Sequence, residues 1–238
     1  MKVFSRPGLC SPALIGINID MFPDIVQSLS PVTLLGGGEV SLADLRAALV
    51  QAPLLVAADG GANMALSAGL MPDAVIGDLD SLTETSRRAL PAERLHLIPE
   101  QESTDFEKCL TRISAPYVLG LGFTGARVDH LLAVWNALVR HPGRRCLILG
   151  RDDVAFAAPR ALRLDLTPGT RISLFPMVPL AGSSRGLLWP IDGLEMSPGG
   201  RIGTSNQATG PVDLAFDSEG MLVILPRSDL LAAIAALR

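Results

Sequence analysis

Short apolar runs alternate with longer, helix-like stretches over the first part of the chain. Continuous apolar runs bounded by glycine or aspartate are typical of strands that are buried on both faces of a parallel sheet. Alternation of such strands with helices predicts an open, mostly parallel sheet in a three-layer α/β domain, over residues 31–152. The six runs are residues 32–35, 54–58, 74–76, 95–98, 117–121 and 146–149.

Helix-start signals lie between these runs. A Ser or Thr stands three residues before an acidic residue in Ser41-x-x-Asp44, Ser81-x-x-Glu84 and Thr104-x-x-Glu107. The hydroxyl can cap a helix, and the last two patterns fit capping boxes. Residues 127–140 carry a helical stripe of apolar residues, so we predict a further helix there.

The pattern of apolar runs and turn residues changes after about residue 150. Strand-like runs separated by Pro, Gly and Asp occupy residues 161–166, 170–175, 185–188, 201–205, 212–216 and 221–225. Many short strands with close turns predict an antiparallel β-sandwich, here over residues 153–238, with a short final helix over 228–238. Residues 1–30 are interpreted as a leader or arm of unknown role.

Composition excludes several classes of protein. The chain has 238 residues, with 48% hydrophobic and 18% charged residues and a formal net charge of -4. No basic run is present, so nucleic-acid binding is not expected, and no apolar window reaches the length that spans a bilayer. Three widely spaced cysteines, Cys10, Cys109 and Cys146, argue against a disulfide framework or a zinc site and favour reduced thiols in a cytoplasmic protein.

Glycines and aspartates cluster where the predicted strands end, which is where open α/β sheets bind ligands. Asp78 and Asp80 are two residues apart, and in an extended turn both carboxylates would point to one side. Two such carboxylates repel unless a cation lies between them, and magnesium prefers hard oxygen ligands. The alternative is that both merely cap a turn. Asp59 and Asp105, at matching strand-to-helix junctions, favour the magnesium site.

The remaining candidates are individually weaker. Residues 36–38 and 60–61 are glycines that allow close approach of a phosphate, but no P-loop or complete dinucleotide fingerprint is present. Gly125 and Arg127 open a helix and could hold phosphate, or Arg127 could be a solvated surface residue. Trp189 could pack at a corner or stack on a flat heterocycle.

Together these motifs resemble the thiamine diphosphokinase (thiamine pyrophosphokinase) family, over about residues 32–226. The matching stretches, in family order, are Ala58-Asp59-Gly60-Gly61-Ala62-Asn63, Pro72-Asp73-x-x-Ile76-Gly77-Asp78-Leu79-Asp80-Ser81, Gln101-x-x-Thr104-Asp105-Phe106-x-Lys108-Cys109-Leu110, Gly122-x-x-Gly125-x-Arg127-x-Asp129-His130, Asn136, Gly186-Leu187-x-Trp189-Pro190 and Thr204-Ser205-Asn206. Any one stretch is weak, but the ordered set is specific. Gln207 departs from the pattern, because many relatives carry an acidic residue there.

The resemblance implies a homodimer that transfers a diphosphoryl group from ATP to thiamine, giving AMP and thiamine diphosphate with magnesium as cofactor. It implies metal ligation by Asp59, Asp78, Asp80 and Asp105, and catalysis by Asp78, Asp80, Asp105 and Arg127. The implied ATP-binding residues are Asp59, Gly60, Gly61, Asn63, Gln101, Thr104, Lys108, Gly125 and Asp129. The implied thiamine contacts are Trp189, Ser205 and Asn206, often across the dimer.

Three alternatives stay open at this point. The first is diphosphate transfer to another heterocyclic alcohol such as a hydroxymethylpterin. The second is a nucleotide-sugar glycosyltransferase, which shares only the D-x-D pattern. The third is a nucleotide sensor without catalytic activity.

Overall fold

All six apolar runs of the first part of the chain form strands of one sheet. The computed structural model describes residues 23–125 and 127–238, so most of the predicted leader lies outside the described residues. The strands run parallel in the spatial order β8-β7-β2-β3-β4-β5, which confirms the predicted parallel α/β sheet. They are β2 (Val32–Leu35), β3 (Leu54–Ala58), β4 (Ala74–Gly77), β5 (Leu95–Leu97), β7 (Val118–Leu121) and β8 (Cys146–Leu149).

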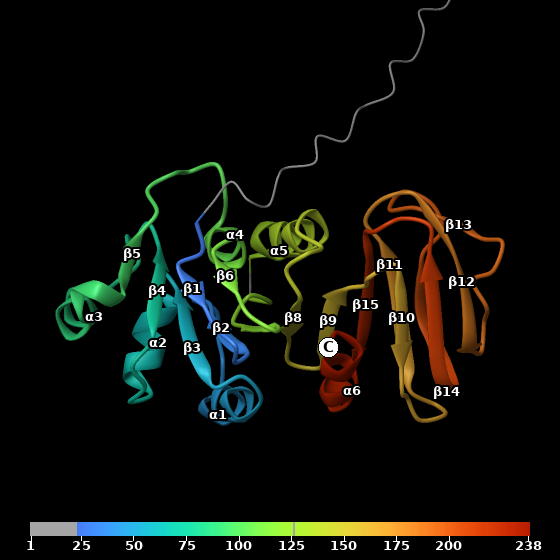
Figure 1. Ribbon diagram of the computed structural model, residues 1–238, viewed down its shortest axis with the longest axis horizontal. Helices are drawn as coiled ribbons and strands as arrows, with labels where there is room; N and C mark the ends of the chain where they lie inside the picture. The colour runs from blue at the N-terminus through green and yellow to red at the C-terminus, as the bar shows by residue number, and fades with distance from the viewer. Residues whose placement is uncertain (1–22, 126) are drawn as a thin grey trace, which may run out of the picture.

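Helices cover both faces of this sheet (Figure 1). On one face, α1 (Leu42–Gln51) and α2 (Gly61–Ser67) pack with Leu35 and Leu55. On the other face, α4 (Asp105–Leu110) and α5 (Val128–Arg140) pack with Leu34 and Val56. Neighbouring residues of one strand thus enter opposite cores, because side chains alternate across a strand. The third short helix, α3 (Glu84–Ala89), lies against α2.

Two of the three predicted helix caps are confirmed. The Ser41 hydroxyl accepts the Asp44 amide, and the Thr104 hydroxyl accepts the Glu107 amide. The predicted cap at Ser81 is wrong, because Thr83 caps α3 instead. The Ser81 hydroxyl donates to the Asp80 carboxylate at 3.0 Å, so it does not serve the helix.

The sheet continues without a break into the second part of the chain. Strand β9 (Asp153–Ala157) pairs antiparallel with β8 on one side and with β15 (Met221–Pro226) on the other. From there the order is β15-β11-β14-β12-β13, which makes 13 strands among the described residues once β10 is added on β14. The structure is therefore a mixed α/β sheet that changes from parallel to antiparallel. The predicted division into two domains stays a prediction.

One long strand replaces two predicted ones. Residues 201–205 and 212–216 were expected as separate strands, but β14 (Gly203–Phe216) contains most of both. Its first half pairs with β11 (Arg171–Pro176), its second half pairs with β10 (Ala161–Leu164), and β12 (Leu180–Leu187) pairs with residues of both halves. A change of partner partway along the strand, near Gly210, explains why the sequence there resembles a turn.

Smaller elements complete the chain. Strand β13 (Glu195–Met196) pairs with β12, and β1 (Val26–Gln27) pairs with β6 (Ile113–Ser114) in a separate two-stranded sheet. The 3-10 helices η2 (Ala92–Arg94) and η3 (Arg227–Asp229) lie in the described part of the chain, and the predicted final helix is α6 (Leu230–Ala236). Cys109 and Cys146 are buried free thiols, whereas Cys10 lies outside the described residues. Within the described ranges, the helices are all too short or too polar to span a bilayer.

Candidate active site

A cleft of about 680 Å³ lies at the carboxyl ends of β2, β3, β4 and β7. Most of the predicted phosphate and metal residues line it: Asp59, Gly60, Asn63, Asp78, Gln101, Thr104, Asp105, Lys108, Gly125 and Arg127. The glycine loop at residues 36–38 forms part of the wall. The cleft is thus where α/β sheets of this kind hold ligands.

Three carboxylates converge beside this cleft. Asp59, Asp78 and Asp80 each offer an oxygen, and these oxygens lie within 4.8 Å of one another. Asp59 is buried, and its Oδ1 atom has no hydrogen-bond partner among the described residues. A buried carboxylate oxygen without a donor is costly unless a cation neutralises it. The donor set and the orphaned oxygen therefore fit a hard divalent cation such as magnesium.

The turn between Asp78 and Asp80 is not extended, so the expected geometry is wrong in detail. Leu79 has a φ of 63°, in the left-handed region, and its side chain is buried. The backbone turns back at this point, and the Asp80 amide donates a hydrogen bond to the Asp78 Oδ1 atom at 3.4 Å. The two carboxylates still converge, but they do so because the backbone folds back at Leu79.

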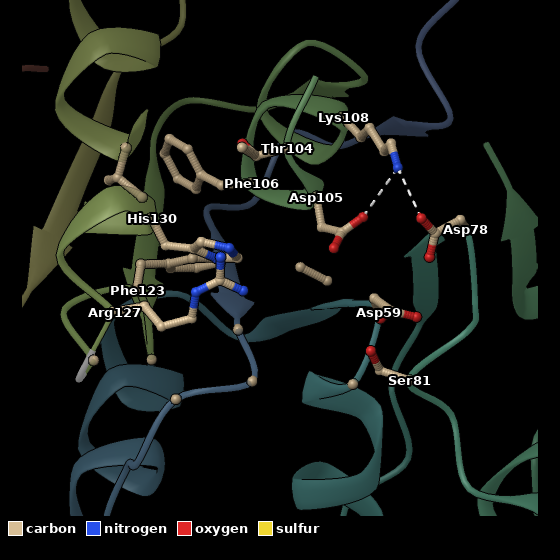
Figure 2. A pocket seen from close by; sticks show the side chains of 18 of the residues that line it. Asp59, Asp78, Ser81, Thr104, Asp105, Phe106, Lys108, Phe123, Arg127 and His130 are labelled. Atoms are coloured by element: carbon tan, nitrogen blue, oxygen red, sulfur yellow. Dashed lines mark hydrogen bonds and ion pairs between the residues drawn. The ribbon is translucent and has the colours of Figure 1, made fainter. Parts of the chain in front are cut away.

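Lys108 contacts one carboxylate of this acidic group, Asp78 (Figure 2). Its ammonium lies 3.2 Å from the Asp105 Oδ1 atom and 3.4 Å from the Asp78 Oδ2 atom, and its side chain is only 2% exposed. Asp105 pairs with this lysine and is outside the group of three converging carboxylates. Its role as a metal ligand stays a prediction.

The local contacts move the pKa values of these groups in opposite directions. The Gln101 amide donates to the Asp78 Oδ2 atom at 3.1 Å and, with the Asp80 amide and Lys108, holds the pKa of Asp78 below its ordinary value despite partial burial. Burial raises the pKa of Asp105, and the charges of Asp59 and Asp78 add to this, although Lys108 opposes it. Asp78 is thus the better permanent anion, and Asp105 is the better proton acceptor.

Arg127 and Asp129 form an exposed ion pair at the mouth of the cleft. The Arg127 Nη2 atom lies 2.6 Å from the Asp129 Oδ2 atom, and this contact lowers the pKa of Asp129 to about 2. Arg127 lines the cleft, but Asp129 does not, so its carboxylate contacts the arginine instead of the cavity. His130, which the sequence did not single out as a site residue, also lines the cleft beside Arg127 (Figure 2). The sequence feature that could have identified His130 as a cleft residue is its position directly after Arg127 and Asp129, in the same matched stretch.

Two other predicted ATP-binding residues have structural roles in the described chain. The Asn63 side chain donates to the Ser81 carbonyl at 2.8 Å and accepts the Thr83 amide at 3.1 Å, so it fixes the loop after β4. A Cβ atom on Gly61 would lie 2.1 Å from the Leu35 carbonyl oxygen. Only glycine therefore allows α2 to begin so close to β2.

The residues predicted to contact thiamine lie outside this cleft. Trp189 is 59% exposed. Asn206 is buried, and its amide group donates to the Trp189 carbonyl at 2.7 Å and accepts the Trp189 amide at 3.1 Å. Ser205 is exposed with a φ of 60°, and its amide donates to the Ser173 hydroxyl. Asn206 thus holds the backbone of Trp189 while the indole stays exposed.

The fold and the cleft together define an α/β protein with an acidic, glycine-lined site at the carboxyl edge of its sheet. Comparison with known proteins makes this class specific. Residues 45–148 match the family model described as thiamin pyrophosphokinase, catalytic domain. Thiamine pyrophosphokinase 1 of Oryza sativa subsp. japonica is 30% identical over 190 residues, covering 66% of this chain and 72% of the relative.

Other relatives extend the comparison. Thiamine pyrophosphokinase 1 of Arabidopsis thaliana is 29% identical, covering 65% of this chain and 71% of its own length. The crystal structure of thiamin pyrophosphokinase from Geobacillus thermodenitrificans superposes with a TM-score of 0.68 at 25% identity, covering 84% of this chain and 99% of that one. The chain belongs to the thiamine pyrophosphokinase family.

Proposed function

We propose that this protein is an ATP-dependent diphosphotransferase that converts thiamine to thiamine diphosphate and releases AMP. The observation that carries the proposal is the convergence of Asp59, Asp78 and Asp80 within 4.8 Å beside a glycine-lined cleft, in a chain of this family. In this proposal residues 31–152 bind ATP and magnesium, and residues 153–238 form a β-sandwich that binds thiamine. The names of the relatives favour thiamine over a hydroxymethylpterin.

The residues of the cleft divide the work of phosphoryl-type transfer, which needs positioning and charge neutralisation. Asp59, Asp78 and Asp80 hold the magnesium, which when bound neutralises charge on the ATP oxygens and on the leaving AMP. Gln101 orients Asp78 through its hydrogen bond. Arg127 reaches the cleft from the start of α5 and binds a phosphate there.

Asp105 is the proposed general base. The transfer breaks the bond between the α-phosphate oxygen and the β-phosphorus, forms a bond to the hydroxyethyl oxygen of thiamine, and releases the hydroxyl proton. Burial raises the pKa of Asp105, so it accepts this proton more readily than Asp78, whose pKa is lowered. Lys108, which contacts both carboxylates, keeps Asp105 ionised before the transfer.

A homodimer completes the proposed site. Trp189, Ser205 and Asn206 do not line the cleft of their own chain, so a second copy would present them to thiamine. The exposed indole of Trp189 offers a stacking surface for a flat heterocycle, and Asn206 fixes its backbone. We place the protein in the cytoplasm, consistent with its buried free thiols.

AMP release in the presence of thiamine, compared with hydroxymethylpterin, tests the proposal directly. We expect thiamine-dependent AMP, and we expect Asp78→Asn and Asp80→Asn each to lower turnover by ~100-fold or more, because each removes charge from the metal site. Asp165→Asn is the matched control, since the Asp165 side chain is 80% exposed and pairs only weakly with a surface arginine. Absence of thiamine-dependent AMP, or near-normal turnover in either variant, would count against the proposal.

A further inference from the structure

The metal-binding turn contains a residue in an unfavourable conformation. Leu79 separates Asp78 from Asp80, and its φ of 63° lies in the left-handed region that residues with a side chain rarely adopt. Its side chain packs in a small apolar cluster with Leu82 and Leu90. Burial of the side chain fixes one end of this residue. The carbonyl group of Leu79 must also be fixed, because it belongs to the peptide bond that joins Leu79 to Asp80.

An arginine from the next helix holds that carbonyl. The Arg87 Nη2 atom donates to the Leu79 carbonyl oxygen at 2.5 Å, across eight residues of sequence. A hydrogen bond from a charged donor is among the stronger hydrogen bonds in proteins, so this contact opposes the unfavourable backbone conformation of Leu79. Asn63 fixes the same loop further on, at Ser81 and Thr83. The turn is therefore clamped from α3 and from α2.

We propose that Arg87 is a positioning residue for the divalent cation site, acting through the Leu79 carbonyl to hold Asp78 and Asp80 at their converging separation. This inference rests on the metal site of the proposed function. Neighbours that orient metal ligands typically contribute 10- to 100-fold in metal affinity. Arg87 itself is absent from the lining of the cleft, so it acts on the ligands and not on the substrate.

The positive charge of Arg87 makes positioning and simple electrostatics predict opposite changes in metal affinity when the guanidinium is removed. A guanidinium near a cation site repels the metal, so its removal should tighten metal binding if electrostatics alone mattered. Positioning predicts the opposite, because a relaxed turn no longer presents both carboxylates together. Weaker metal binding after loss of a positive charge therefore separates positioning from simple electrostatics.

The adjacent arginine provides a matched control. Arg88 stands on the same short helix, and its exposed guanidinium pairs with Glu84. Arg87→Met and Arg88→Met each remove one positive charge from α3 and keep an unbranched side chain. Only the first removes the contact with Leu79. Arg87→Lys tests whether a different cationic donor restores part of the effect.

Binding of Mn²⁺ alone, followed by the EPR signal of the free ion, measures the site without substrate or turnover. We expect Arg87→Met to weaken Mn²⁺ binding about 10-fold, Arg87→Lys to weaken it less, and Arg88→Met to change it by less than about twofold. Measurements are made well below the unfolding temperature of each metal-free variant, so that partial unfolding does not contribute. Combining Arg87→Met with Asp80→Asn should add little further loss, because both act on the same ligand.

The outcomes separate the two proposals. Unchanged or tighter Mn²⁺ binding by folded Arg87→Met, or an equal loss in Arg88→Met, would overturn the role of Arg87 and leave the proposed function standing. If Arg87→Met fails to fold, Arg87→Gln, which also removes the guanidinium, takes its place, and unchanged Mn²⁺ affinity in that variant would overturn the role instead. Failure of the wild-type protein to bind Mn²⁺ would refute the metal site and the role of Arg87 together.

Discussion

Replacement of Lys108 by methionine should destabilise the metal-free protein in a way that magnesium reverses. The substitution keeps the apolar stem and removes an ammonium that lies 3.2 Å and 3.4 Å from two carboxylates. At an effective dielectric constant of about 20, each contact is worth about 5 kcal/mol before desolvation is counted. Breaking a buried pair costs about 3–5 kcal/mol in measured cases.

The net cost in this protein is smaller than that range. The side chains of Asp78 and Asp105 are 19% and 37% exposed, so water screens part of the interaction. We therefore expect a loss of about 2–3 kcal/mol in the free energy of unfolding. For a chain of this size that corresponds to a fall of about 4–12 °C in Tm.

The magnesium response distinguishes this explanation from a simple packing defect. Without the ammonium, Asp59, Asp78, Asp80 and Asp105 repel one another, so the native state of Lys108→Met gains more from a bound cation. Thermal unfolding followed by circular dichroism, in EDTA and in excess Mg²⁺, measures both effects. Arg163→Met is the control, because Arg163 also contacts two carboxylates but is 60% exposed. An unchanged Tm of Lys108→Met in EDTA, or an equal Mg²⁺ response in wild type, would refute the reasoning.

Three further changes test other parts of the structure. Glu107→Gln should lower the free energy of unfolding by about 1–2 kcal/mol at neutral pH, because it removes a carboxylate that accepts a hydrogen bond from His141. This hydrogen bond lowers the pKa of Glu107, so the difference between variant and wild type, measured by urea titration, should shrink as pH falls below 4.5. Gly61→Ala should sharply lower the yield of folded protein, whereas Gly37→Ala, whose Cβ meets nothing within 4 Å, should leave both yield and Tm nearly unchanged. Trp189→Ala should raise the KM for thiamine with little change for ATP, and equal changes for both would contradict a stacking role.

The strands of the parallel sheet were predictable because a strand that is buried on both faces is mostly apolar along its whole length. Residues 146–149 are a continuous apolar run, residues 32–35 are apolar except for Thr33, and the structure buries every residue in both. Strand β14 has no such apolar pattern in its sequence. Its middle, around Gly210 and Pro211, has the composition of a turn, yet the strand continues because β11 pairs with its first half, β10 pairs with its second half, and β12 pairs with both. Long-range pairing of this kind depends on tertiary contacts that local pattern does not encode.

The types of residue in the cleft were also predictable, but their contacts were not. The sequence placed Asp59 and Asp78 at strand ends, which is enough to expect them near one another. It could not show that Lys108 would be buried between Asp78 and Asp105, or that Leu79 would adopt a left-handed backbone. Such details depend on the packing of α4 against the sheet and on the contact from Arg87, which are tertiary contacts that the local sequence pattern does not encode.

The continuity of the sheet bears on how the proposed thiamine residues could reach the acidic cleft. Strand β9 is paired with β8 through three residue pairs and with β15 through five, and Phe156, which is paired on both sides, is fully buried. One apolar core includes residues of both β8 and β15, so bending at this junction would break hydrogen bonds and expose apolar surface together. A hinge that brings Trp189 onto its own cleft is therefore costly. A second copy can present the same indole without disturbing either core, which is the physical reason that the proposed homodimer accounts for the separation better than closure within one chain.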